Sequence, residues 1–282
     1  MVVGSIQFGY QPLGRCAMLS RKKPAMDDST IEDSPEEPPP QPPAAAPPRI
    51  AYRHRLPTRI WHWVNAITVF VMIMSGLMIL NAHPRLYWGL YGANFDHPWI
   101  NFGPRPFPGW ATIPSMYNLA AARIWHLAFA WVLVIGLIAF LLTSLWNRHV
   151  QRDLALRLGE LAPRHVWHDV KEHARLRFPT GYAALRYNTL QKISYVAVIF
   201  VFLPLMILTG LTMSPSMNAA WPWLLTLFGG RQSARSIHFI VAAAILGFIV
   251  VHLVMVVLAG PVNEVWSMLS GRYRVPPDRS DA

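Results

Sequence analysis

The 282-residue sequence contains a single cysteine, Cys16, and few acidic residues. One cysteine excludes a disulfide bond within the chain and a cysteine-ligated iron–sulfur cluster. Aspartate and glutamate together number 14, against 25 lysines and arginines, and neither occurs in the longest hydrophobic runs. Those runs therefore lack both the carboxylates and the thiolates that bind many protein metals. Residues 1–48 also lack an apolar core as long as a signal peptide needs, so we expect no signal peptide.

Apolar residues, by contrast, are abundant. They make up 53% of the sequence, charged residues only 14%, and the mean hydropathy is +0.28. Four apolar runs cover residues 60–80, 124–146, 193–213 and 237–259. Each run is about 20 residues long, which is enough to cross a bilayer as a helix. The sequence predicts an all-α integral membrane protein with four transmembrane helices.

The net charge of +11 is distributed unevenly along the chain. Lysines and arginines number four in residues 41–59, nine in 146–192 and three in 260–282. Residues 81–123 and 214–236 together hold five. This distribution follows the positive-inside rule and places both termini and the 146–192 loop in the cytoplasm. Membrane orientation explains the charge, so we predict no nucleic-acid partner.

The sequence divides into three predicted regions. Residues 1–50 are rich in proline and charge and are expected to form a disordered cytoplasmic tail. Residues 51–270 hold the four-helix domain, and residues 271–282 are expected to form a cytoplasmic C-terminal tail. Within the long loop, residues 164–178 predict an amphipathic helix on the cytoplasmic surface.

Two histidines, His238 and His252, lie fourteen residues apart in the last hydrophobic run. Fourteen residues of α-helix make almost four full turns and rise about 21 Å, so both imidazoles project from one face near opposite membrane surfaces. An ionisable ring inside a membrane helix is costly and indicates function. Either histidine alone could instead hydrogen-bond a neighbouring helix. Two rings on one face favour ligands for two metal centres.

The predicted topology sorts the other membrane histidines by depth. His62 begins the first run at the cytoplasmic side, and His126 begins the second at the periplasmic side. His126 therefore pairs with His238, and His62 with His252. Two facing imidazoles are what a six-coordinate b-type haem requires, whereas zinc would need further ligands. The chain has no Cys-x-x-Cys-His site for covalent attachment, so we expect both haems to be bound non-covalently.

An arginine precedes three of these histidines by one helical turn: Arg59, Arg123 and Arg235. Each lies on the same side of its helix as the histidine and nearer the membrane surface. A single arginine at a helix end commonly just reaches to the interface. Three copies of one offset predict a shared role, the pairing of haem propionates, with Arg59 at the cytoplasmic haem and the other two at the periplasmic haem.

Two small features of the helices also lead to expectations. Gly76 lies fourteen residues after His62 on the same helix face, where it would either admit a bulky group or pack against another helix. Pro204 is predicted to kink the third helix.

The sequence resembles the di-haem cytochrome b family. This family includes the formate dehydrogenase gamma subunit, the nickel–iron hydrogenase and thiosulfate reductase cytochrome b subunits, and bacterial cytochrome b561. The resemblance covers residues 51–270. It rests on Arg59-Ile60-Trp61-His62-Trp63, His126, Tyr187-Asn188-Thr189-Leu190-Gln191-Lys192, Thr209-Gly210-Leu211, and the spacing of His238 and His252.

The resemblance implies a four-helix transmembrane bundle that holds two haems b in a bacterial inner membrane. It also implies an electron-transfer subunit that joins a periplasmic molybdenum or iron–sulfur oxidoreductase subunit to the quinone pool. In the formate dehydrogenase branch, an Asn-Ala-Gly-Gln segment lies beside the quinone. Asn188 and Gln191 match its ends and are the candidate quinone-binding residues, whereas Thr189 and Leu190 replace its middle pair.

Two other functions compete with this one. The chain could be a stand-alone enzyme of the cytochrome b561 type that exchanges electrons between quinone and a small periplasmic species such as superoxide. A haem-free transporter or anchor would leave the paired histidines unexplained. The loops at 81–118 and 214–236 are rich in aromatic residues, which commonly form a belt at the lipid–water interface. A belt would explain a few of them, whereas their number and the surrounding prolines favour a folded cap that serves as a docking surface for a periplasmic partner.

Overall fold

Long helices dominate the computed structural model, which describes residues 49–93, 95–146, 162–175 and 189–275. Most of the predicted N-terminal tail, the end of the C-terminal tail and Asn188 lie outside the described residues. The elements are β1 (Ile50–Tyr52), α1 (Leu56–Ala82), β2 (Arg85–Leu86), β3 (Ile100–Asn101), η1 (Gly109–Ala111), α2 (Leu119–Trp146), α3 (Pro163–Ala174), α4 (Thr189–Val196), η4 (Ala197–Phe202), α5 (Leu203–Met213), α6 (Pro215–Ala220), α7 (Trp223–Leu227), α8 (Arg231–Ala259), α9 (Pro261–Ser270) and β4 (Arg272–Arg274).

Within the described part of the chain, four helical segments are long and apolar enough to cross a membrane. They are Leu56–Ala82, Leu119–Trp146, Thr189–Met213 and Arg231–Ala259, and each contains one of the predicted runs. Large apolar side chains cover their outer faces: Ile67 is 61% exposed, Ile135 62% and Val251 62%. A soluble monomer rarely exposes so much contiguous apolar surface, whereas lipid covers it at no cost. The prediction of an all-α, multi-pass membrane protein is confirmed.

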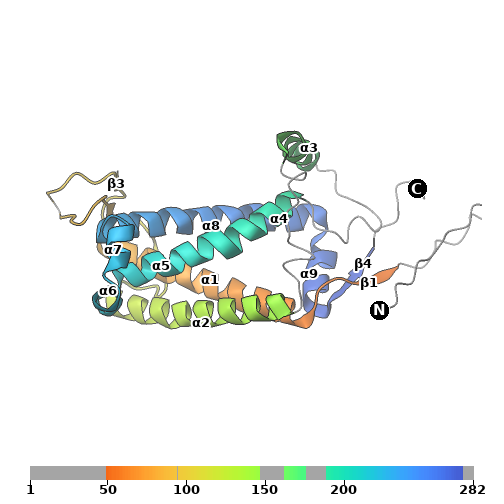
Figure 1. Ribbon diagram of the computed structural model, residues 1–282, viewed down its shortest axis with the longest axis horizontal. Coiled ribbons are helices and arrows are strands. Elements are labelled where there is room, and N and C mark those ends of the chain that lie inside the picture. The colour runs from red at the N-terminus through yellow and green to blue at the C-terminus, as the bar shows by residue number, and fades with distance from the viewer. Residues whose placement is uncertain (1–48, 94, 147–161, 176–188, 276–282) are drawn as a thin grey trace, which may run out of the picture. The chain divides into compact units, whose positions relative to one another are not determined.

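The four spans run alongside one another (Figure 1). Helix α1 packs on α2, and α5 packs on α8. Leucine, isoleucine and valine from three of the spans fill the middle of the bundle. The buried members of this central apolar layer are Leu133, Leu137, Leu203, Val241 and Ile245. Because Val241 and Ile245 fall between His238 and His252 on α8, the layer separates the two depths at which the histidines lie.

The third span departs from α-helical geometry directly before Pro204. Residues 197–202 form the π-helical segment η4, and α5 begins at Leu203. Proline has no N–H to donate, and its ring crowds the carbonyl group four residues earlier. A wider π turn relieves this crowding. Pro204 is thus preceded by a π-helical segment, and the kink predicted for the third helix stays a prediction.

At one end of the bundle, the loop after α1 is tied to the start of α8. Strands β2 and β3 pair antiparallel, and the chain between them returns to α8. The Gly89 carbonyl accepts the N–H groups of Gln232 (3.1 Å) and Ser233 (3.2 Å), and the Gly89 N–H donates to Ser233 Oγ at 2.7 Å. Gly230 has a φ of +112°, and a Cβ there would overlap the Gly89 carbonyl. Only glycine allows this close approach without strain.

At the other end, the two ends of the four-helix domain meet. Strand β1 pairs antiparallel with β4, with Ala51 opposite Tyr273. Arg53, directly after β1, forms an ion pair at 3.1 Å with Glu264 of α9. The sequence predicted a tail from residue 271, but residues 272–274 form β4 instead. The pairing joins segments more than 200 residues apart, and no local pattern in the sequence indicates it.

Helix α3 covers Pro163–Ala174 and overlaps the segment 164–178 that was predicted to form an amphipathic helix. Trp167 and His168 are exposed on it. Among the described residues, no three of histidine, cysteine, aspartate and glutamate gather as metal ligands.

Candidate functional site

The structure brings the four membrane histidines together in two pairs. The first pair is His126 on α2 and His238 on α8, with ring centres 6.3 Å apart and ring planes at 59°. The second pair is His62 on α1 and His252 on α8, with ring centres 6.3 Å apart and ring planes at 58°. The first pair lies toward the end of the bundle with β2 and β3, and the second toward the end with β1, β4 and α9 (Figure 1).

Hydroxyl groups hold both rings of the first pair. Ser75 Oγ lies 3.0 Å from His126 Nδ1, and Thr209 Oγ1 lies 2.9 Å from His238 Nδ1. Each hydroxyl also donates to a carbonyl of its own helix, Ser75 to Met72 at 3.2 Å and Thr209 to Leu205 at 2.7 Å. Because the hydroxyl proton is used there, the oxygen accepts from the ring Nδ1–H. This assignment leaves Nε2 of each imidazole as the free lone pair, ready to bind a metal.

A glycine follows each of these hydroxyl residues and lies beside the same ring. A Cβ at Gly76 would lie 3.4 Å from His126 Cε1, and a Cβ at Gly210 would lie 3.6 Å from His238 Cε1. The sequence left open whether Gly76 admits a bulky group or packs on a helix, and the structure places it against an imidazole. The hydroxyl residues were missed in the sequence, although the dipeptides Ser75-Gly76 and Thr209-Gly210 are a signal that could have identified them.

The second pair has different surroundings. Phe248 stacks on His252 at 5.9 Å, and Trp63 packs edge-on against His62 at 5.2 Å. The buried Nδ1 of His62 has no hydrogen-bond partner among the described residues. The ring spacing is therefore the same in both pairs. Hydroxyl groups contact both Nδ1 atoms of the first pair, whereas Nδ1 of His62 has no hydrogen-bond partner in the described part of the chain.

The three arginines one turn before the histidines have separate environments. Arg59 Nε donates to the Met268 carbonyl at 3.3 Å, and Arg123 is exposed. Arg235 donates from its two terminal nitrogens to the carbonyls of His83 and Arg85. Its contacts fix the loop after α1, a task that the helical offset did not predict.

Gln191 is half-buried on α4, and Asn188 precedes the described part of that helix. Helix α4 lies toward the β1, β4 and α9 end of the bundle (Figure 1). On the next turn of α4, Tyr195 interacts with the charges of Arg53 and Glu264. This interaction places the start of the third span at the same end as the second histidine pair.

His83 is a further histidine near the first pair. Its ring stacks on Tyr87 at 5.8 Å. Burial, together with the positive charges of Arg235 and Arg85, lowers the pKa of His83. His83 is therefore a neutral histidine stacked within the loop after α1.

The residues present fit a bis-histidine haem. Two metal–nitrogen bonds of about 2 Å, with about 1.1 Å from each nitrogen to its ring centre, separate two ring centres by roughly 6.2 Å. Both observed spacings are 6.3 Å. In the first pair, the hydroxyl contacts at Nδ1 leave Nε2 free for the iron. The glycines keep side-chain atoms away from the same rings.

The family described as prokaryotic cytochrome b561 matches residues 53–271. The chain belongs to this family. It is therefore a multi-pass membrane cytochrome that binds b-type haem, as the resemblance in the sequence predicted.

Individual relatives of this cytochrome fall into two groups. A protein of Azospira oryzae, named as protein-methionine-sulfoxide reductase subunit YedZ1, is 27% identical over 201 residues, which cover 71% of this chain and 87% of that protein. Proteins of Cupriavidus necator and Azotobacter vinelandii, named as Ni/Fe-hydrogenase B-type cytochrome subunits, are 24% and 23% identical. Each alignment covers 82% of this chain, and 89% and 91% of the respective relative. No solved structure matches the chain. By name, these relatives are subunits of a reductase or a hydrogenase, and the family match makes this chain a membrane b-type cytochrome.

Proposed function

We propose that this cytochrome holds two b haems, one at each histidine pair, and passes electrons between an oxidoreductase partner and the quinone pool. The observation that carries the proposal is the equal 6.3 Å spacing of two imidazole pairs at opposite ends of one bundle. Bound haem supplies a one-electron carrier. The chain supplies the ligands and, between the two depths, the central apolar layer that excludes water.

The distribution of basic residues sets the proposed orientation. Both termini and the 146–192 loop face the cytoplasm of a bacterial inner membrane by the positive-inside rule. The first histidine pair then lies on the periplasmic side and the second pair on the cytoplasmic side. An electron donor in the periplasm would approach the first pair, and quinone in the membrane would approach the second.

A spectrum tests the proposal directly. The purified protein is expected to show a low-spin b-type band in its reduced-minus-oxidised spectrum and a pyridine haemochrome ratio of two haems per chain. A ratio of one would contradict the two-site proposal, and a protein without haem would contradict the electron-transfer function.

The arginines are proposed to pair with haem propionates, and Arg123 provides the clearest test. Arg123→Leu is expected to make the potential of the haem at the first pair more negative, by roughly 40 mV or less, because a positive charge that favours the reduced form is lost. Potentiometric titration of both haems measures the shift. Arg59→Leu is the matched variant and should shift the other haem. If neither potential moves, the arginines are membrane anchors only.

Quinone is proposed to bind beside the second pair, with Asn188 and Gln191 as hydrogen-bond donors to a quinone carbonyl. Asn188→Ala is expected to slow reoxidation of the reduced haems by quinone about tenfold, because a hydrogen bond to the developing negative oxygen is lost. Stopped-flow spectroscopy gives the rate, and the haem content should stay unchanged.

The alternative role of Asn188 is to cap α4, which it directly precedes. Asn188→Ser separates the two roles, because serine caps a helix as well as asparagine does but lacks the amide. Equal slowing in both variants supports quinone binding. Normal kinetics in the serine variant would assign the residue to capping.

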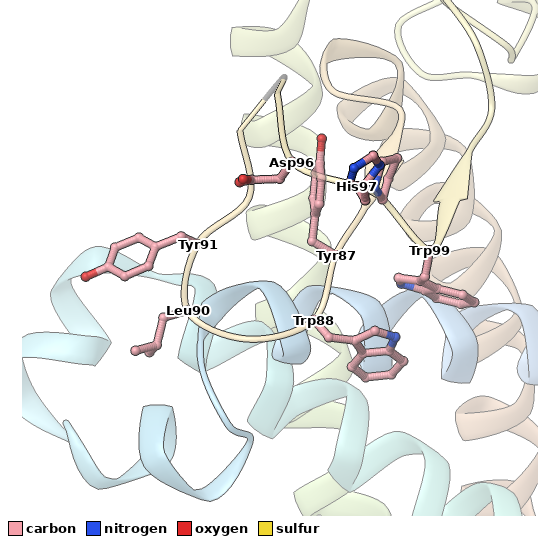
Figure 2. A pocket seen from close by; sticks show the side chains of 8 residues that line it. Tyr87, Trp88, Leu90, Tyr91, Asp96, His97 and Trp99 are labelled. Carbon is pink, nitrogen blue, oxygen red and sulfur yellow. The ribbon is translucent and has the colours of Figure 1, made fainter.

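An oxidoreductase partner is proposed to dock over the first pair. Trp88 and Trp99 stack with ring centres 5.4 Å apart, and Figure 2 shows them side by side while Tyr91 points away from them. Trp99 Nε1 donates to Ser236 Oγ at 2.9 Å, which fixes the loop to α8 two residues before His238. A rigid aromatic surface above a haem ligand suits a redox partner, because the electron must cross a short distance there. By resemblance, the partner is a molybdenum or iron–sulfur oxidoreductase subunit.

The second candidate function is that of a stand-alone enzyme of the cytochrome b561 type. The match to the family described as prokaryotic cytochrome b561 supports this candidate. Such an enzyme would exchange electrons between quinone and a small periplasmic species such as superoxide. Purification from native membranes in mild detergent separates the two functions. A stoichiometric oxidoreductase subunit supports the first, whereas a cytochrome that purifies alone and reacts with superoxide supports the second.

A further inference from the structure

Ser75 and Thr209 make the same set of contacts from two different helices. Each is fully buried, donates its hydroxyl proton to a carbonyl of its own helix and lies within hydrogen-bond distance of Nδ1 of one imidazole of the first pair. Each also precedes a glycine that lies beside that ring. A hydroxyl of α1 thus contacts the histidine of α2, and a hydroxyl of α5 contacts the histidine of α8.

A buried hydroxyl in a membrane helix does not by itself imply a role in a site. Thr212, one turn beyond Thr209 on α5, is also buried and donates to the Leu208 carbonyl at 2.8 Å. Bonding of this kind satisfies a serine or threonine within its own helix. Ser75 and Thr209 differ because their oxygens also accept from an imidazole, so Thr212 provides an internal reference.

We propose that Ser75 and Thr209 are positioning residues for the haem at the first pair. They fix the tautomer and the ring orientation of His126 and His238 and strengthen both imidazoles as electron donors to iron. The proposal rests on the haem sites of the proposed function and adds two residues to one of them.

The direction of the effect follows from the hydrogen bond. An acceptor at Nδ1–H makes the imidazole more basic at Nε2, and a more basic ligand stabilises the oxidised metal. The hydroxyls therefore make the potential of this haem more negative. His62 Nδ1 in the second pair has no hydrogen-bond partner among the described residues, so this tuning is absent from that ring.

The test compares hydroxyl removal with hydroxyl retention. Thr209→Val keeps the shape of the side chain and removes the oxygen, Ser75→Ala removes the other oxygen, and Thr209→Ser and Ser75→Thr keep both hydroxyls. Thr212→Val removes a buried hydroxyl that touches no imidazole. Potentiometric titration and the electron paramagnetic resonance spectrum of the oxidised haems are measured for each purified protein.

Thr209→Val and Ser75→Ala are expected to make one haem potential more positive and to change the low-spin resonance of that haem, which depends on the orientation of its imidazoles. Haem affinity at this site should fall about tenfold or more. The other haem, the hydroxyl-retaining variants and Thr212→Val should match the unmodified protein. Selective loss of the same haem in the hydroxyl-free variants would also support the proposal.

Unchanged potentials and resonances in both hydroxyl-free variants would overturn the proposal, as would equal changes in both haems. Equal effects of Thr212→Val and Thr209→Val would also overturn it, because they would show a general packing role. The proposed function fails separately, if the unmodified protein holds no haem. The three outcomes above are instead measured with an unmodified protein that binds two haems, and they overturn only this proposal.

Discussion

Replacement of His62 with alanine is expected to lower the haem content from two per chain to one and to leave the other haem spectroscopically normal. His62 and His252 face each other at 6.3 Å, and the first pair lies on the far side of the central apolar layer. Without one of its two imidazoles, this pair would no longer hold a bis-histidine haem, whereas the first pair would keep both of its ligands. The pyridine haemochrome ratio and the low-temperature difference spectrum measure the result.

Two further variants check this expectation. His252→Ala should lose the same haem as His62→Ala, and the double variant should lose no more than either alone. His97→Ala replaces an exposed loop histidine and should retain both haems. Full haem content in His62→Ala would show that His62 and His252 do not hold a haem together.

Replacement of Trp88 and Tyr91 together with alanine is expected to abolish reduction of the haems by the partner protein while reduction by dithionite survives. The two side chains are 51% and 84% exposed on the loop between β2 and β3. Aromatic anchors at the centre of an interface each contribute about 2 kcal/mol, so losing two would weaken docking by roughly three orders of magnitude. Stopped-flow mixing with the co-purified oxidoreductase subunit measures the rate.

Trp99 is left intact because its indole N–H holds Ser236, two residues before His238, and its loss would disturb the haem site itself. Trp167→Ala is the matched control, since it removes an exposed tryptophan from α3, which lies toward the opposite end of the bundle from β3 (Figure 1). A normal rate of reduction in the double variant would place docking elsewhere or favour the stand-alone enzyme.

Much of the bundle could be predicted because the signals are local and periodic. The length of each apolar run and the fourteen-residue interval between His238 and His252 depend only on helix geometry. Counting helices from a charge-determined orientation then assigned His62 and His126 to opposite depths. The structure brings together the same two histidine pairs, although their role as haem ligands stays a prediction.

The roles of the arginines were harder to predict from the same kind of pattern. The offset from Arg235 to His238 predicted a propionate partner, and this role stays a prediction. The structure adds contacts that the offset did not indicate, from the terminal nitrogens of Arg235 to the carbonyls of His83 and Arg85. The spacing between two residues of a helix determines whether they share a helix face. It does not determine which loop packs against that face. The remaining donors of Arg59 and the exposed Arg123 are compatible with the proposed role.

The sequence by itself determined that this protein crosses a membrane four times and carries histidines at two depths, because hydrophobic length and helical spacing are properties of single segments. Only the tertiary structure decided that Ser75 and Thr209 hold the rings of His126 and His238, that β1 pairs with β4, and that Gly89 and Ser233 close one end of the bundle. These contacts join different helices or distant segments. They depend on how each helix rotates about its axis and packs on its neighbour, which no single segment specifies.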